Sequence, residues 1–321
     1  MCSRHYGSTY DHIQKGMHTM KIHINDYNSL DEAIRSEFGE SVTVEGRSYI
    51  GGGDINDAAC LMLTNGEQVF IKSNKISNKD FFDTEVSGLN AIAGTNTITT
   101  PKLICKGTDR ERGTSFLMME LIRGGKKIKD YWEVFGRELA AMHLADTDDH
   151  VKSGKFGFAE NNYIGAGRQI NTCKESWVDF FRECRLEPQF KRAERYFDSA
   201  FRKNIIILMD NIDKILTEPE KPSLLHGDLW SGNFITGNDG KAWLIDPAVY
   251  VGHAEADIAM TELFGGFSGS FYSAYREVNP TEEGYKRRKN IYNLYHMLNH
   301  LNLFGSGYLS TVRSMVYNAI R

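Results

Sequence analysis

The sequence lacks the features of a membrane, disulfide-linked or zinc-binding protein. Its longest strongly apolar run is Ile205-Ile206-Ile207-Leu208-Met209, whereas a membrane helix needs about 20 apolar residues. Its five cysteines are an odd number and contain no CxxC pair, so neither a disulfide framework nor a paired-cysteine zinc site is expected. We therefore predict reduced thiols, a cytoplasmic location and no membrane contact.

Two further features that the sequence lacks narrow the class of protein. The formal net charge is −4, so the chain lacks the basic excess with which general nucleic-acid binders neutralise phosphates, and no nucleic-acid partner is expected. The first twenty residues are polar and lack the apolar core of a signal peptide. We interpret residues 1–20 as a flexible leader.

The first half of the chain has the pattern of a small β-rich lobe, which we place at residues 21–121. Five runs rich in β-branched and aromatic residues predict strands at 42–50, 57–64, 67–73, 101–106 and 114–121. Asn65-Gly66 predicts a hairpin turn with positive φ at both central positions. Asn78 or Asp80 is expected to cap a helix that runs to about residue 93.

The second half, residues 122–321, has a mainly helical pattern. Gly124-Gly125 interrupts the chain, and apolar residues at helical spacing predict helices at 131–145, 177–181, 201–216, 256–264 and 291–303. The predicted architecture is an α+β fold of two lobes, with a hinge near residues 119–125.

The most specific motif is His-Gly-Asp-Leu-Trp-Ser-Gly-Asn at 226–233, followed by Ile-Asp-Pro at 245–247. Asp228 and Asn233 are five positions apart, as in the kinase pattern HRDxxxxN. Phosphoryl transfer needs a carboxylate at the attacking hydroxyl and oxygen ligands that hold Mg²⁺ against the phosphates. We assign Asp228 the first role, and Asn233 and Asp246 the second. The alternative is that Asp228 is only a turn residue and Asn233 only a cap.

Upstream segments offer contacts for ATP. Gly51, Gly52 and Gly53 could let the backbone approach a phosphate, although a flexible hairpin explains them equally well. Val-Phe-Ile-Lys at 69–72 is similar to the kinase VAIK strand, so Lys72 is expected to meet the phosphates and to pair with Glu85 on the following helix. The alternative for both residues is a solvated position.

The end of the fifth predicted strand is a candidate adenine site. Met119, Glu120 and Leu121 stand just before Gly124-Gly125, where a kinase hinge offers backbone groups to the base. An ordinary strand end is the alternative.

Longer segments resemble the fructosamine kinase (ketosamine 3-kinase) family. They are HGDLWSGN, IDPAVYVGHAEADIAMTELFGGF at 245–267, YNLYHMLNHLNLFGSGY at 292–308, FGFAENNYIG at 156–165 and RLEPQ at 185–189. The likeness covers roughly residues 22–320. Aminoglycoside phosphotransferase relatives share HGDxxxxN and the Ile-Asp pair, but not the segments near the C-terminus.

The resemblance implies a protein-kinase-like fold and transfer of the ATP γ-phosphate to the sugar 3-hydroxyl of a ketoamine, of fructosamine or ribulosamine type. The acceptor of such an enzyme would be a small ketoamine or a glycated protein, and the role of the enzyme would be deglycation repair. It carries over the Lys72–Glu85 ion pair, the catalytic Asp228 and the magnesium ligands. Trp230 becomes a platform for the sugar.

Several residues near these motifs have structural interpretations. We expect Asp257, at the start of a predicted helix, to hold backbone N–H groups of the catalytic loop rather than to catalyse. His226 is expected to brace that loop. His296 and His300 lie four apart on one helical face, and core packing is preferred over a metal site. Some family members have a cysteine in the glycine-rich loop where this chain has Asp54, so redox switching through that loop is not expected.

Two other functions remain open on the sequence. A kinase of another small alcohol, such as an aminoglycoside, choline or homoserine, would share the catalytic motifs. A non-catalytic nucleotide-binding module would be expected to have lost one of Lys72, Asp228, Asn233 or Asp246, and all four are present. The sequence leaves open which sugar and amine are preferred, and the oligomeric state.

Overall fold

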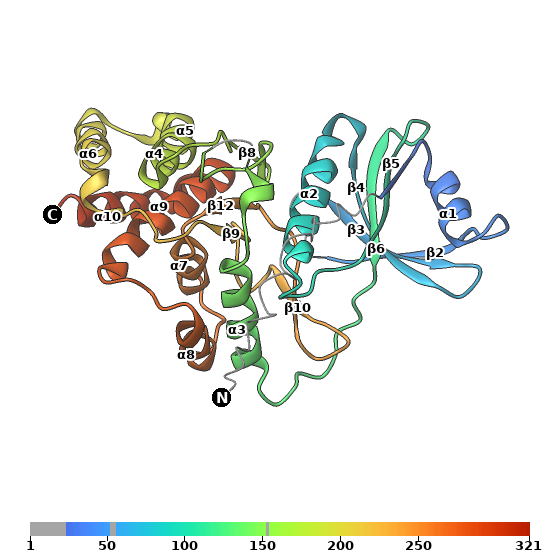
Figure 1. Ribbon diagram of the computed structural model, residues 1–321. Coiled ribbons are helices and arrows are strands. Elements are labelled where there is room, and N and C mark those ends of the chain that lie inside the picture. The colour runs from blue at the N-terminus through green and yellow to red at the C-terminus, as the bar shows by residue number, and fades with distance from the viewer. Residues whose placement is uncertain (1–23, 52–55, 152–153) are drawn as a thin grey trace, which may run out of the picture.

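The computed structural model describes residues 24–51, 56–151 and 154–321. In these ranges a six-stranded sheet with two helices forms one lobe, and a larger, mainly helical part forms the other (Figure 1). The predicted α+β fold of two lobes is confirmed. The proposed leader at residues 1–20 lies outside the described residues.

The sheet contains β1 (Asn25–Tyr27), β2 (Val44–Tyr49), β3 (Asp57–Leu63), β4 (Gln68–Lys75), β5 (Leu103–Asp109) and β6 (Thr114–Glu120). Its strand order is β1-β5-β6-β4-β3-β2, with β1 parallel to β5 and the other neighbours antiparallel. Helices α1 (Leu30–Phe38) and α2 (Asp80–Gly94) cover opposite faces (Figure 1).

Strand β4 lies inside the sheet, between β3 and β6. Successive side chains of a strand point to opposite faces. Ile71 is buried in one cluster with Ile34 of α1, whereas Phe70 packs on the other face with Phe82 of α2. Lys72 follows Phe70 by two positions and therefore points to the α2 face, toward the helical lobe.

The five strands predicted for this lobe correspond to β2–β6 and the predicted helix corresponds to α2, but the prediction was incomplete. The described residues also contain β1 and α1. Helix α1 begins with Ser29, whose side chain accepts a hydrogen bond from the Glu32 N–H, while the Glu32 carboxylate accepts one from the Asn28 N–H. This arrangement is close to a capping box, and the Ser-x-x-Glu spacing at 29–32 is the signal that could have revealed the helix.

Two local predictions also need correction. Neither Asn78 nor Asp80 caps α2, because Lys79 is the N-cap residue and no side chain caps the helix start. The hairpin between β3 and β4 exists, but only its glycine, Gly66, has positive φ, at 87°. The Leu63 N–H bonds back to the Glu67 carbonyl, so a glycine bulge widens the turn and Asn65 keeps an ordinary conformation.

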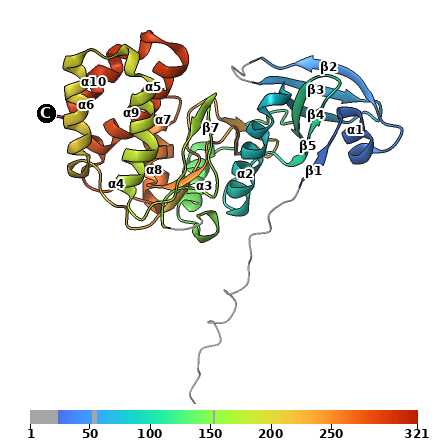
Figure 2. The same cartoon turned by 90° about the horizontal axis from the view of Figure 1, so that it is seen from above.

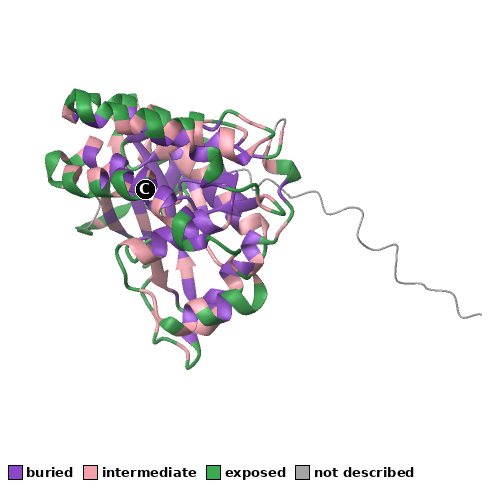
Figure 3. Ribbon diagram, turned by 90° about the vertical axis from the view of Figure 1, so that its left-hand side faces the viewer, coloured by how far each residue is buried: buried purple, intermediate pink, exposed green. Residues whose placement is uncertain are grey.

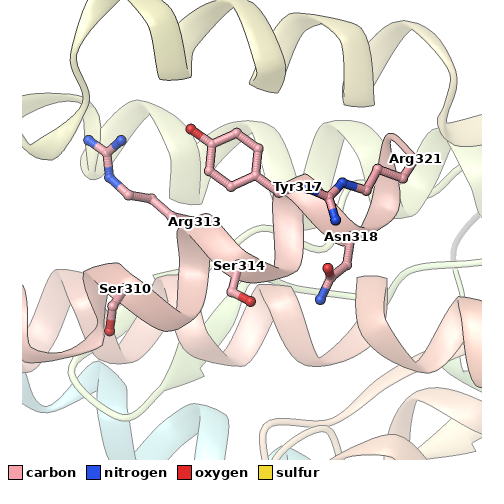
Figure 4. Close-up of a pocket in the computed structure, with 6 residues that line it drawn as sticks. All are labelled: Ser310, Arg313, Ser314, Tyr317, Asn318 and Arg321. Carbon is pink, nitrogen blue, oxygen red and sulfur yellow. The ribbon is translucent and has the colours of Figure 1, made fainter.

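The helical lobe is built around one large apolar cluster. Figure 3 shows the buried residues of the molecule in purple. Its helices are α3 (Tyr131–His143), α4 (Trp177–Phe181), α5 (Glu187–Arg192), α6 (Ser199–Asp210), α7 (Glu255–Leu263), α8 (Gly269–Val278), α9 (Tyr285–Phe304) and α10 (Leu309–Ala319). The predicted helices correspond to α3, α4, α6, α7 and α9, whereas α5, α8 and α10 were not predicted. None of the helices in the described ranges is long and apolar enough to cross a membrane.

Short strands in this lobe carry the loops of the site. Strands β7 (Asn162–Ile164) and β8 (Gly167–Gln169) form a hairpin beside α2 (Figure 2). Strand β9 (Ser223–Leu225) pairs with β12 (Tyr250–Gly252), and β10 (Phe234–Thr236) with β11 (Ala242–Leu244). Strands β10 and β11 form a hairpin between Asn233 and Asp246.

Candidate active site

Lys72 is one of the points at which the two lobes meet. It is 7 % exposed, and its Nζ lies 2.5 Å from Glu85 Oε1 on α2 and also donates to Asp246 Oδ1 in the helical lobe. Burial alone would lower the pKa of Lys72, but the carboxylates of Asp246 and Glu85 outweigh it and raise that pKa above its ordinary value. Lys72 therefore stays charged inside the molecule, and the solvated alternative is wrong.

The loop 226–233, which follows β9, is held by the side chain of Asp257 of α7. The carboxylate of Asp257 accepts hydrogen bonds from the His226 N–H at 2.7 Å and the Gly227 N–H at 2.9 Å. Burial would raise the pKa of Asp257, but hydrogen bonds and nearby histidines lower it overall, so it remains an acceptor. The structural role predicted for Asp257 is confirmed.

Two neighbours of Asp257 complete the support of this loop. His226 Nε2 lies 2.9 Å from the Ile245 carbonyl, as expected of a loop-bracing histidine. Gly227 has a φ of 81°, and a Cβ there would lie 2.0 Å from the Ala248 carbonyl oxygen. Only glycine fits at that position.

Asp228 and Asn233 form one hydrogen-bonded unit at the end of the loop. Asn233 Nδ2 donates to the Asp228 carbonyl at 2.8 Å and to its Oδ2 at 3.2 Å. Burial, followed by the charges of Asp246 and Asp257, raises the pKa of Asp228 to about 7, against the bond from Asn233. A half-buried carboxylate of this kind can exchange a proton near neutral pH.

Asp246 stands at a sharp turn directly after β11. Its φ is 54°, which is uncommon for a residue other than glycine. The Ile245 N–H donates to the Asn233 carbonyl at 3.1 Å, so the backbones that carry Asn233 and Asp246 are linked.

Asn233 and Asp246 fit a magnesium ion. Asn233 uses its amide N–H₂ on Asp228, which leaves its carbonyl oxygen for a cation, and the Asp246 side chain is 46 % exposed. Among the residues that the structure describes, no cluster of three His, Cys, Asp or Glu side chains could hold a metal. Mg²⁺ commonly takes one or two protein oxygens and completes its shell with phosphate oxygens and water, which suits this pair.

Trp230 lies at the outer edge of the same loop and is 39 % exposed. Its ring packs over Gly232, where a Cβ would come within 2.4 Å of the indole. The ring centroid lies 6.3 Å from that of Phe264, which is itself 5.1 Å from His300. The chain thus presents an accessible row of rings beside Asp228.

Comparison with known proteins decides the family. The model of the fructosamine kinase family matches residues 27–321. The chain belongs to the fructosamine kinase family. It is 38 % identical over 301 residues to a protein of Synechocystis named "probable ketoamine kinase", covering 92 % of this chain and 97 % of that one. It is 40 % identical over 286 residues to a chloroplastic protein-ribulosamine 3-kinase of Oryza sativa subsp. indica, covering 88 % and 81 %.

A solved structure supports the same assignment. A crystal structure from Haemophilus somnus assigned to the fructosamine-3-kinases aligns with a TM-score of 0.80 at 29 % identity, covering 91 % of this chain and 97 % of that one. The two-lobed arrangement of this fructosamine kinase family member is protein-kinase-like, with the buried lysine on an inner strand, its glutamate on the adjacent helix and the paired Asp and Asn in the larger lobe.

The remaining predicted nucleotide contacts are Met119–Leu121 at the end of β6 and the glycines that follow β2 in the sequence. Met119 is buried near the end of β6, and the Glu120 N–H donates to the Lys102 carbonyl. Leu121 follows β6 and is half-buried. Gly51 is exposed, whereas Gly52, Gly53 and Asp54 lie outside the described residues. The ATP contacts of these positions remain predictions.

Sequence reasoning missed a buried chain behind Asp257. His143 of α3 has its Nε2 3.1 Å from Asp257 Oδ2 and its Nδ1 2.7 Å from the Tyr275 hydroxyl. Asn279 Nδ2 donates to the same hydroxyl at 3.0 Å. His143 therefore contacts the same Asp257 oxygen that accepts from the His226 N–H and helps to fix the carboxylate. The sequence signal for this contact was His143 itself, a histidine at the end of a helix with an apolar face.

Proposed function

We propose that this protein is an ATP-dependent ketoamine kinase that transfers the γ-phosphate to the 3-hydroxyl of the sugar. The observation that carries the proposal is the double contact of Lys72 with Glu85 and Asp246. These contacts join the sheet, α2 and the turn after β11 close to Asp228. Phosphoryl transfer to an alcohol requires such positioning of charged groups around the phosphates.

The charge and position of each side chain in the site suggest its role in the reaction. Lys72 presents a buried positive charge to the phosphates, while Glu85 fixes its direction. Asp228 accepts a hydrogen bond from the sugar hydroxyl and orients its oxygen for attack on the γ-phosphorus, and can take up its proton. Asn233 and Asp246 hold Mg²⁺, which when bound neutralises phosphate charge.

The acceptor is proposed from the family and from the exposed aromatic row. A ketoamine joins a polar sugar to an amine that carries a positive charge when protonated. An accessible indole face beside Asp228 can contact the apolar side of the sugar and attract that cation. Deglycation of small amines or proteins, and a cytoplasmic location, are proposed with this activity.

The other functions are less well supported. Relatives at about 40 % identity over most of the chain are named for ketoamine and ribulosamine substrates, which does not favour a kinase for aminoglycosides, choline or homoserine. A non-catalytic nucleotide-binding module would be expected to have lost a catalytic or metal-binding residue, whereas Lys72, Asp228, Asn233 and Asp246 are all present.

An acceptor panel tests the proposal. ADP release is measured with ATP–Mg²⁺ and, separately, a ribulosamine, a fructosamine, an aminoglycoside and choline, with Asp228→Asn as the inactive control. The proposal expects turnover with at least one ketoamine and little with the other alcohols. Turnover confined to an aminoglycoside or choline would replace the assigned substrate, and no acceptor-dependent turnover would favour a binding module.

A further inference from the structure

The backbone that follows Asp246 is held by side chains from the β7–β8 hairpin. Gln169 Nε2 donates to the Ala248 carbonyl at 2.9 Å, and Asn162 Nδ2 donates to the Val249 carbonyl at 2.7 Å. Both amide side chains are buried. Consecutive carbonyls, two and three residues after Asp246, are therefore fixed by side chains that stand 79 and 87 positions earlier in the chain.

The orientation of both amides is determined by their partners. The Ala248 carbonyl can only accept, so Gln169 Nε2 must face it, and the Tyr295 hydroxyl donates to Gln169 Oε1 at 2.7 Å. The Arg185 guanidinium, which can only donate, bonds to Asn171 Oδ1 at 2.8 Å, so Asn171 Nδ2 donates to Asn162 Oδ1 at 2.9 Å. Asn162 Oδ1 also accepts from Gln169 Nε2 at 2.8 Å. Asn162 Nδ2 must therefore face Val249.

This network supports a backbone segment with an uncommon conformation. Asp246 has a φ of 54°, and such conformations persist where the surrounding structure fixes them. The Ala248 N–H donates to the His226 carbonyl at 2.8 Å, so the segment is tied to the catalytic loop on one side and to the two amides on the other.

The same hairpin also contacts the helix that carries Glu85. The Tyr163 ring centroid lies 4.0 Å from that of Phe81 on α2, and β7 lies beside α2 in Figure 2. Gly88 of α2 packs against Pro247 and Val249, where a Cβ would stand 3.2 Å from a carbon of each side chain. The hairpin therefore touches both elements that bring a carboxylate to Lys72.

We propose that Gln169 and Asn162 are positioning residues that set the metal-binding orientation of Asp246. The inference rests on the proposed role of Asp246 as a magnesium ligand. In protein kinases, phosphorylation of an activation loop controls whether the corresponding Asp and the Lys–Glu pair are in place. Here a buried amide network from another part of the chain fixes the turn that carries Asp246, so the metal-binding orientation does not depend on phosphorylation of a loop.

The test compares four variants in metal binding. Gln169→Met keeps the length of the side chain but removes its hydrogen bonds, and Tyr295→Phe removes only the hydroxyl that orients Gln169. Arg168→Ala, at an exposed position of β8, is the local control. Val312→Ala, in the buried face of α10, is a control for general destabilisation. Mn²⁺ binding in the presence of ADP is titrated by electron paramagnetic resonance, and hydrogen exchange of residues 246–251 is measured without nucleotide.

Gln169→Met is expected to weaken Mn²⁺ binding about tenfold or more, the usual effect of losing a partner that orients a metal ligand. It should also speed exchange at 246–251, and excess metal should restore turnover. Tyr295→Phe should act in the same direction but less strongly, and it keeps the test informative if Gln169→Met does not fold. Both controls should keep the parent affinity, even where Val312→Ala lowers Tm.

An unchanged Mn²⁺ affinity and exchange rate in both network variants would overturn the proposal. Asp246→Asn separates this failure from failure of the proposed function. If Asp246→Asn loses Mn²⁺ while the network variants bind normally, the metal site stands and the positioning role is wrong. If Asp246→Asn binds Mn²⁺ like the parent, the metal assignment is wrong and the positioning role falls with it.

Discussion

Asp228→Asn should inactivate the enzyme and, at alkaline pH, stabilise it. The substitution keeps the shape of the side chain and removes its charge. Turnover should fall at least tenfold, because general-base assistance is typically worth about 10²–10⁴ in rate. ADP binding should persist, because the proposed nucleotide contacts belong to other residues.

The stability effect follows from the raised pKa of Asp228. Burial, with the charges of Asp246 and Asp257, moves that pKa from 3.8 to about 7. Between these two values the folded protein keeps a proton that the unfolded chain has lost, so the parent loses stability as pH rises through this window and the loss is complete above it. Each pH unit corresponds to about 1.4 kcal/mol. Because the carboxylate is only half-buried, we expect a total of about 1–3 kcal/mol rather than the full value.

Asparagine does not titrate, so the difference between variant and parent isolates this group. Urea unfolding without nucleotide or metal should give a variant that is more stable at pH 8, by about 1–3 kcal/mol, with a much smaller difference at pH 4.5. Asp210→Asn, at an exposed position of α6, should show no such difference. A variant that is less stable than the parent at pH 8, or a gain that does not change with pH, would refute the reasoning.

Four further predictions follow from the site. Lys72→Ala should lower kcat/KM for ATP by about a hundredfold or more in a folded protein, as measured by circular dichroism and kinetics, and a normal value would exclude the phosphate role. Trp230→Ala should raise the acceptor KM by roughly two- to thirtyfold, as expected for about 0.5–2 kcal/mol of cation–π attraction, with the KM for ATP unchanged; unchanged acceptor kinetics would make Trp230 a packing residue. Asp257→Ala leaves two buried N–H groups unpaired, each worth about 1–3 kcal/mol, so urea unfolding should show a large loss of stability, and parent-like stability would contradict the loop-holding role. Removal of divalent metal with EDTA should abolish turnover, and full activity in EDTA would exclude the metal role of Asn233 and Asp246.

The parts of the site that the sequence revealed are those written in short motifs. Asp228, Asn233 and Asp246 stand at fixed spacing around one hairpin, and Lys72 ends the Val-Phe-Ile-Lys run that is similar to the kinase VAIK strand. Their closeness in space follows once the two-lobed fold is accepted. Asp257 was identified because a carboxylate at the start of a predicted helix can hold backbone N–H groups of the catalytic loop.

The missed residues act over long separations. Asn162 and Gln169 bond to carbonyls 87 and 79 positions away, and His143 meets a hydroxyl 132 positions away. No local periodicity encodes such contacts, and polar residues in a short hairpin look solvated in sequence. Helix α1 is a different case, because its Ser29-x-x-Glu32 signal was present but was followed by a short helix with only two buried residues, Ala33 and Ile34.

The position of the phosphate on the product tests the central claim most directly. A ribulosamine and a fructosamine are each incubated with the enzyme, ATP and Mg²⁺, and the products are examined by ³¹P and ¹³C nuclear magnetic resonance. The account predicts a phosphate ester on the sugar 3-hydroxyl of at least one ketoamine, formed together with ADP and absent with Asp228→Asn. A phosphate at another hydroxyl would contradict the regiochemistry, and ATP hydrolysis without any phosphorylated ketoamine would contradict the activity itself.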